Sequence, residues 1–231
     1  MSILFTDIAD RIRAVGAQRA TLHSPGVRIS TVNAISSAIV MDWQATVWMS
    51  ITELDNTDIC VGTIDFLTVR CGDTAVADVL DEHSEAAVPF IPLFDGRFAA
   101  ESVSRQFGEE TINSVLLIVD ALLQDGVQGR NLGPWAATEV IHWMLPSTDG
   151  LVAAYPSPLY SSESTEAIEK LTRTWQKAGM EPLTGHPGIL GQHSAYTHLA
   201  DARHKLRDVS SVSFAVDVDF LESWPEISAA D

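Results

Sequence analysis

Residues 114–145 read SVLLIVDALLQDGVQGRNLGPWAATEVIHWML, and the stretch divides into a strand, a loop and a helix. Ser114–Leu123 is apolar on both faces except for Asp120, a pattern typical of a central strand that is covered on both sides. Gly126–Gly133 is a polar loop that contains three glycines. Pro134 then stands where a helix would begin, because the first helical position tolerates a missing N–H. This order of elements predicts an α/β protein.

Patterns elsewhere in the chain predict the elements that surround this unit. β-Branched and aromatic residues dominate two neighbouring segments, and the polar residues Asp55–Asp58 between them supply turn chemistry, so we expect an antiparallel hairpin. Apolar and polar residues alternate from Val212 to Phe220, as in a strand with one buried face. The expected elements are helices at 5–17, 73–83, 97–107, 134–145 and 165–178, strands at 46–54, 59–70, 114–123, 151–155 and 212–220, and a loop at 88–96.

Length and composition are those of a globular protein. A chain of 231 residues with 46% hydrophobic content can bury a core of its own, and this length fits one domain. Cys60 and Cys71 flank a predicted strand without a CxxC or Cys/His pattern, so we expect reduced, buried thiols and no structural zinc. The N-terminus lacks the apolar core of a signal peptide, and no apolar run approaches the roughly 20 residues of a membrane span. These features predict a soluble, cytoplasmic protein.

The charge balance is strongly acidic. The formal net charge of −17 comes from 31 acidic and 14 basic residues. Such a field repels nucleic acid and anionic lipid and attracts cationic partners such as amines and basic peptides. An equally simple explanation is that the charge serves solubility alone. Charge therefore excludes nucleic-acid and membrane partners without identifying a ligand.

The loop before Pro134 has the composition of an anion-binding site. Small residues allow the backbone to approach a phosphate, and the free N–H groups at the start of a helix point toward it with the favourable end of the helix dipole. The residues concerned are Gln128, Gly129, Arg130, Asn131, Leu132 and Gly133. Arg130 would add a charged contact. An ordinary strand-to-helix turn explains the same residues, and the absence of GxGxxG disfavours a Rossmann nucleotide site.

The segment LLQDGVQGRNLGPWAATEVI resembles the pyrophosphate-binding motif of GNAT acetyltransferases, which is usually written Q/R-x-x-G-x-G/A. Gln128 and Gly133 match its first and last positions, and Asn131, which tolerates positive φ, replaces the middle glycine. Downstream, Gly150–Pro156 is similar to the family's fifth strand. The segment LTRTWQKAGMEPL is similar to its late helix and turn, so together these matches cover about a third of the chain.

The resemblance implies a fold, a co-substrate and a reaction. The fold would be mixed α/β, an acyl-CoA N-acyltransferase-like domain with a central, twisted, largely antiparallel sheet of six or seven strands flanked by helices. It would span 1–231 as one domain, with 1–40 and 184–231 as possible additions. The central strand would splay from its neighbour, the pantetheine arm of acetyl-CoA would pair with Ala121, Leu122 and Leu123, and the loop amides would hold the pyrophosphate. The activity would be N-acetyl transfer to an amine, and a homodimer is possible.

Proton transfer in such a reaction needs a base for the ammonium and an acid for the leaving thiolate. At the position of the family's usual tyrosine acid this sequence has Trp175, whose indole N–H is not a useful acid. Tyr160 is the candidate acid in its place, because it lies near the end of the next predicted strand. Tyr155 and Ser162 lie in the same region and are further candidates. Asp120 is the candidate base, because burial would raise its pKa, although it is equally explained as a satisfied core residue or as a residue facing solvent.

Other polar residues have simpler explanations. Asp65 and Glu53 lie in or beside the hairpin and would bind a cationic acceptor or form part of a solvated strand face. The histidines have spacings that match no helical metal motif, so we expect no metal and a polar surface segment; they are His186, His193, His198 and His204, with Asp201 among them. Two other functions stay open: a catalytically inactive acyl-CoA-binding or protein-interaction module of the same fold, and an unrelated α/β protein.

Overall fold

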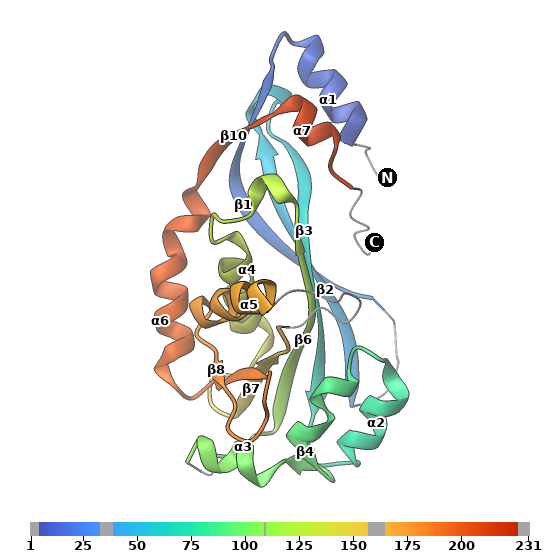
Figure 1. Ribbon diagram of the computed structural model, residues 1–231, viewed down its shortest axis with the longest axis vertical. Helices are drawn as coiled ribbons and strands as arrows, with labels where there is room; N and C mark the ends of the chain where they lie inside the picture. Colours follow the sequence, from blue (N-terminus) through green and yellow to red (C-terminus); the bar gives the residue numbers. More distant parts are fainter. Residues whose placement is uncertain (1–4, 33–38, 109, 157–164, 226–231) are drawn as a thin grey trace.

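The computed structural model describes residues 5–32, 39–108, 110–156 and 165–225, and an eight-stranded sheet is its centre (Figure 1). The strand order across the sheet is β10-β1-β2-β3-β6-β7-β9-β8. The strands are β1 (Arg19–Thr31), β2 (Val40–Ile51), β3 (Thr57–Arg70), β6 (Ser114–Leu123), β7 (Gly150–Ala154), β8 (Glu181–Pro182), β9 (Leu190–His193) and β10 (Ser213–Asp217). A separate small hairpin is formed by β4 (Phe94–Asp95) and β5 (Phe98–Ala99).

All pairings in the main sheet are antiparallel except one. β10, β1, β2, β3 and β6 form an antiparallel run, β6 and β7 are parallel, and β9 returns antiparallel to both β7 and β8. The expected mixed α/β fold with a largely antiparallel sheet is therefore confirmed. Within the described residues the main sheet has eight strands rather than the expected six or seven, and the short edge strand at 181–182 was not predicted.

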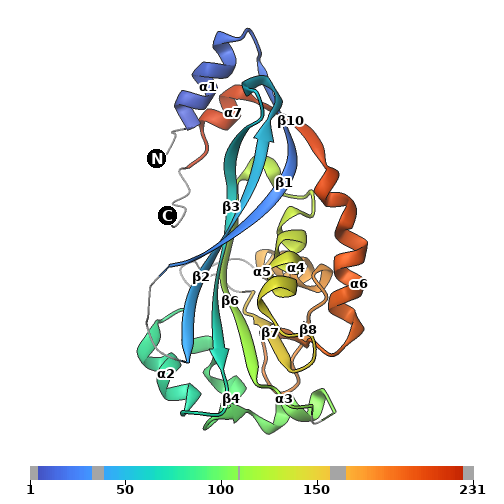
Figure 2. The ribbon, with the colours of Figure 1, turned by 180° about the vertical axis from the view of Figure 1, so that it is seen from behind.

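Helices cover both faces of the sheet (Figures 1 and 2). The helices are α1 (Phe5–Ala14), α2 (Val76–His83), α3 (Glu101–Gln106), α4 (Leu132–Met144), α5 (Thr165–Lys177), α6 (Thr197–Leu206) and α7 (Val218–Glu222). Short 3-10 turns lie at η1 (Thr52–Leu54), η2 (Val88–Leu93), η3 (Asp125–Val127) and η4 (Arg207–Ser211). Helix α4 runs beside β6 with α5 and α6 around it, α2 and α3 cover the lower part of the opposite face, and α1 packs with α7 at the far end. No helix in the described ranges combines the length and apolarity that crossing a bilayer requires.

Alternate residues of β6 point into two separate apolar cores. Leu116 and Ile118 belong to the larger core, which contains α4, α1 and α7. Val115 and Leu117 belong to the smaller core under α2, η2 and α3. This alternation is the period-2 geometry of a strand that is buried on both faces, as the apolar run predicts for this part of β6.

Most of the predicted elements are confirmed, with shifted ends. The hairpin is formed by β2 and β3, and its turn contains Asp55 and Asn56 at φ 52° and 60°. Helix α4 begins at Leu132 rather than Pro134, so Gly133 lies inside the first turn. The predicted loop at 88–96 contains a 3-10 turn and a strand of the small hairpin. Strand β1 was not predicted, because its alternation is interrupted where the pairing register shifts between His23 and Gly26.

The strand predicted at Val212–Phe220 is wrong in its second half. β10 ends at Asp217, and the chain continues as helix α7. Val218 and Leu221 are buried, and α7 packs on α1. A helix places Val218 and Leu221, three residues apart, on one face against α1, which an alternating strand would not do. Tertiary packing therefore overrides the local pattern.

The cysteines are free thiols, as expected. Cys71 is buried and Cys60 is half-buried. Burial raises the pKa of the Cys71 thiol to about 11, and burial likewise raises the pKa of Cys60. Both thiols are therefore poor nucleophiles at neutral pH.

Candidate functional site

Strand β6 is paired on both sides only in its first half. Ser114–Ile118 lies between β3 and β7, and the parallel pairing with β7 ends at Ala154. Pairing with β3 continues to the end of β6 after a β-bulge at Val119. Among the described residues, Val119–Leu123 thus has a neighbouring strand on one side only, although it lies inside the sheet (Figure 1). We call this segment the open half of β6.

Two backbone groups of the open half bond to side chains instead of a neighbouring strand. The N–H of Ala121 donates to Oδ1 of Asp120 at 2.8 Å. The carbonyl of Leu123 accepts a hydrogen bond from Nε2 of Gln128 at 3.1 Å. Asp120 and Gln128 are exposed, so both can turn away and leave these backbone groups to a ligand with its own amides.

Asp120 lacks the burial that its interpretation as a base with a raised pKa requires. Asp120, Ala121 and Leu122 are exposed, and the side chain of Leu122 is 48% accessible. The apolar pattern of the run does not change at Ile118, but the neighbouring strand β7 ends there. Of the alternatives for Asp120, the structure supports a carboxylate that faces solvent.

The loop that follows β6 contains two residues in the left-handed region. Gly129 has φ +76° and Asn131 has φ +60°. Asparagine is among the residues that tolerate this conformation best, which explains why it can stand at this position. Gly133 lies against β6, because a Cβ there would be 3.3 Å from Cδ1 of Leu123. Small residues thus bring the start of α4 close to the open half.

Within the described ranges, none of the backbone N–H groups from Gly129 to Gly133 makes a hydrogen bond of good geometry, although the turn at Gln128 and Gly129 directs the N–H of Arg130 toward the preceding carbonyls. Asn131 is the N-cap of α4, and its side chain makes no capping bond. Helix starts leave such donors unsatisfied, and the helix dipole adds partial positive charge there. The predicted loop residues therefore place amide donors without well-formed partners at the start of α4, beside the open half.

Two basic residues lie at this loop, Arg130 and Lys177. The guanidinium of Arg130 lies 3.8 Å from the ring centroid of Phe214, in a cation–π contact with β10. Lys177, at the end of α5, donates to Oδ1 of Asn131 at 2.8 Å. Sequence reasoning missed Lys177, because nothing in the sequence indicates that a residue 46 positions downstream returns to this loop.

Two carboxylates face each other across β3 and β6 next to the open half. Asp65 and Asp120 are directly paired, so their side chains share one face of the sheet. Gln44 on β2 donates to Oδ1 of Asp65 at 2.9 Å. Burial raises the pKa of Asp65, the hydrogen bond from Gln44 opposes this, and the charge of Asp120 raises it further. The affinity of Asp65 for a proton is thus above that of an ordinary aspartate.

Of the candidate proton donors Tyr155, Tyr160 and Ser162, only Tyr155 lies within the described residues. Trp175 is buried in the larger core, with 5% of its surface accessible. Tyr155 is half-buried and packs against the smaller core near Gly188. Tyr160 and Ser162 lie outside the described residues.

Glu53 has a structural role. Its carboxylate accepts hydrogen bonds from the N–H and the hydroxyl of Thr21, both at 2.8 Å, and so ties η1 to β1. Burial opposes ionisation, but the bonds from Thr21 outweigh it and lower the pKa of Glu53. This residue is therefore not available to an acceptor.

The histidines of the C-terminal region are dispersed. His186 is hydrogen-bonded to Ser102 at 2.7 Å, buried His193 lies near the carbonyl of Thr111, and exposed His198 lies 3.6 Å from Glu181. Within the described ranges, no three His, Cys, Asp or Glu side chains form a cluster suited to a metal ion.

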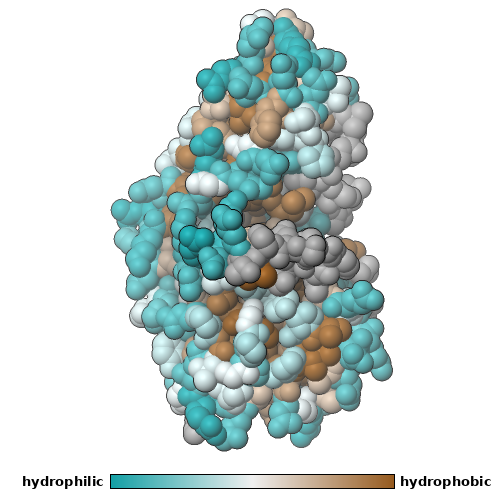
Figure 3. All heavy atoms as spheres, viewed as in Figure 1, coloured by the Kyte–Doolittle hydropathy of each residue, from teal (hydrophilic) through white to brown (hydrophobic). Residues whose placement is uncertain are grey.

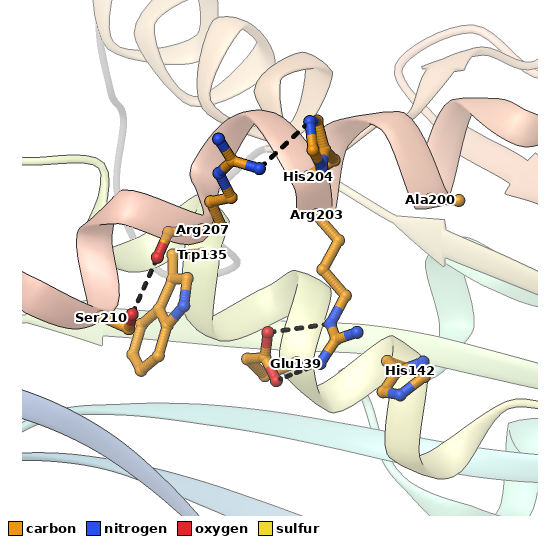
Figure 4. Close-up of a pocket in the computed structure, with 8 residues that line it drawn as sticks. All are labelled: Trp135, Glu139, His142, Ala200, Arg203, His204, Arg207 and Ser210. Atoms are coloured by element: carbon orange, nitrogen blue, oxygen red, sulfur yellow. Dashed lines mark hydrogen bonds and ion pairs between the residues drawn. The ribbon is translucent and has the colours of Figure 1, made fainter.

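Two grooves lie beside α6. The larger, of about 650 Å³, separates α6 from α4, and Arg203 crosses it to hold Glu139 with bonds of 2.9 and 3.1 Å (Figure 4). This pair ties two helices together and lies apart from the predicted loop. The smaller groove, of about 490 Å³, is lined by Asn131 of the loop and by residues of α5 and α6.

Searches among protein-family models, curated proteins and solved structures found no match to this chain.

Proposed function

We propose that the protein is an acetyl-CoA-dependent N-acetyltransferase of the GNAT type, with an amine of a small molecule or protein as acceptor. One observation carries this proposal: within the described residues, the interior strand β6 is paired with β7 only as far as Ala154, beside a helix start whose N–H groups lack well-formed hydrogen bonds. An extended ligand with amides at one end and phosphates at the other matches both features.

The residues present fit acetyl-CoA in two respects. Ala121, Leu122 and Leu123 offer one-sided strand backbone to the amides of a pantetheine arm. The N–H groups from Gly129 to Gly133 offer donors to a pyrophosphate, and Gln128 is exposed beside them. When bound, acetyl-CoA supplies the thioester that an amine can attack.

Asp65 and Asp120 supply the acid–base chemistry in this proposal. A carboxylate pair attracts a cationic amine, and a carboxyl with a raised pKa, such as Asp65, accepts a proton from it more readily. Because Trp175 is buried and cannot act as an acid, water protonates the thiolate in this scheme, or Tyr160 does so.

A second function is favoured by the same tryptophan. A protein that binds acyl-CoA without transferring the acyl group needs the open half and the loop but no proton donor. Buried Trp175 at the position of the family's usual tyrosine agrees with such a binding module.

Calorimetric titration with acetyl-CoA tests the shared part of both functions. We expect saturable binding that is lost in Gly129→Val, because a β-branched residue resists the φ of +76° and alters the loop. Gly96→Val is the matched control, since Gly96 also has positive φ and open space around it but belongs to the distant β4–β5 hairpin.

Thiol release in the presence of amines then separates the two functions. Release that depends on Asp65 establishes the transferase, and binding without release under any amine establishes the module. Absence of acetyl-CoA binding by the intact protein contradicts both.

A further inference from the structure

The smaller groove continues directly from the loop at the start of α4. Asn131 lines its near end, and residues from the end of α5 and from α6 line the rest, among them Lys177, Asp201 and Lys205. Its volume of about 490 Å³ is within the range of small-molecule sites. Figure 3 shows hydrophilic side chains along this side of the molecule, where α6 lies. The groove is therefore an extension of the candidate phosphate site toward solvent.

The charges of this region differ from those of the rest of the chain. The only three lysines in the sequence are Lys170, Lys177 and Lys205, and all lie on α5 or α6, although the chain has a net charge of −17. Lys177 and Lys205 line the groove, and neither forms an ion pair with a described carboxylate. Two ammonium groups without carboxylate partners face one groove, which favours an anionic ligand.

Two carboxylates also line the groove and limit the charge that it can accept. Glu181 lies 3.6 Å from Nδ1 of His198. Asp201 lies about one turn before Lys205 on α6 and forms no ion pair in the described part of the chain. Asp201 therefore opposes an anion near Lys205, and its removal should strengthen binding.

Lys177 connects the groove to the loop amides. Its ammonium group is 2.8 Å from Oδ1 of Asn131, a neutral oxygen. A phosphate oxygen is a stronger acceptor for an ammonium group than an amide oxygen. A ligand phosphate at the loop can thus replace Asn131 as the partner of Lys177.

Building on the proposed function, we propose that this groove binds the 3′-phosphate of the nucleotide end of CoA, with Lys205 as the residue that selects it and Lys177 shared with the pyrophosphate. The acyl donor is then free acyl-CoA. An acyl group on a carrier protein's phosphopantetheine arm has a single phosphodiester and no terminal phosphate, so it cannot satisfy Lys205.

The test compares acetyl-CoA with 3′-dephospho-acetyl-CoA by calorimetry, using the full chain. We expect the intact protein to bind acetyl-CoA about tenfold more tightly, a difference of about 1.4 kcal/mol. Lys205→Gln should reduce this preference to about twofold, and Asp201→Asn should increase it. Lys170→Gln is the matched control, because Lys170 is exposed on α5 but does not line the groove, and its preference should remain tenfold. The preference should also shrink as salt rises from 0.05 to about 0.5 M, because exposed charges are screened.

The outcomes separate this inference from the proposed function. Equal affinity of the intact protein for the two donors, or a preference that Lys205→Gln leaves unchanged, overturns the groove assignment and leaves the acetyl-CoA site intact. If neither donor binds, the proposed function fails and the groove assignment fails with it. Unchanged melting temperatures of the variants establish that each remains folded.

Discussion

The two halves of β6 have similar apolar sequences and opposite environments. In Ser114–Ile118 the side chains enter two cores and both neighbouring strands are present. In Val119–Leu123 the side chains are half-buried or exposed, and one neighbouring strand is absent from the described chain. A strand segment inside a sheet with an unpaired side leaves backbone groups for another chain or ligand. The first half therefore stabilises the fold, and the second half is the part that a ligand can complete.

The largest expected difference between the two halves is in the loss of stability when a leucine is truncated to alanine. Leu116 is fully buried, and Leu116→Ala should lower the free energy of unfolding by about 3 kcal/mol through lost burial and a cavity. Leu122 is 48% accessible, so Leu122→Ala should change it by no more than about 0.5 kcal/mol. Urea denaturation of both variants measures the difference. Similar losses at both positions would mean that the open half is covered in solution.

A smaller effect is expected where β3 touches the open half. A Cβ at Gly62 would lie 2.5 Å from the carbonyl oxygen of Leu122, so Gly62→Ala must displace backbone and should cost about 1–3 kcal/mol. Gly26→Ala in β1 is the control, because a Cβ there meets nothing within 4 Å. Acetyl-CoA titration of both variants should find weaker binding only for Gly62→Ala. If Gly62→Ala binds acetyl-CoA as tightly as the intact protein, the ligand site does not depend on the contact between β3 and the open half.

A smaller, pH-dependent effect is expected at Asp65. Because its pKa is raised, the folded state disfavours the ionised carboxylate, and this penalty is present at neutral pH. Asp65→Asn keeps an acceptor for Gln44 and should raise stability at pH 7 by less than about 1 kcal/mol. The gain should disappear as the pH falls below the ordinary carboxyl value of 3.8.

Thermal unfolding between pH 3 and 8 measures this dependence. Asp81→Asn, at an exposed position of α2, is the control and should show no such gain. A loss of stability at pH 7 in Asp65→Asn would mean that the carboxylate is stabilised by a partner that outweighs burial.

The smallest effect is expected at Asp120. Its carboxylate caps the N–H of Ala121 in an exposed segment, so water can replace it in Asp120→Ala. Chemical denaturation should detect a change within about 0.5 kcal/mol. A loss above about 2 kcal/mol would show that the cap is a structural part of the sheet rather than a replaceable contact.

The sequence predicts the strand, loop and helix of residues 114–145 because the signals there are local. An apolar run, a glycine-containing loop and Pro134 each act on their own backbone, and Asn131 adopts the positive φ that its chemistry permits. The loop residues predicted to bind an anion accordingly lie together at the start of α4.

Features that depend on distant segments could not be predicted. Asp120 is exposed because β7 ends before it. Arg130 makes its cation–π contact with Phe214 of β10, and Lys177 at the end of α5 donates a hydrogen bond to Asn131. The helix at Val218–Glu222 likewise follows from packing on α1 rather than from its alternating pattern. No local periodicity encodes these long-range contacts.

Residue-resolved amide hydrogen exchange with and without acetyl-CoA tests the central claim most directly. The amides of Val115–Ile118 should be protected in both states, because both neighbouring strands and two cores cover them. The amides of Ala121 and of Gly129–Gly133 should exchange rapidly in the free protein and slowly once acetyl-CoA is added. Equal protection of the two halves in the free protein, or unchanged exchange at Ala121 and the loop with ligand present, would contradict the assignment of the open half and its loop as the acyl-CoA site.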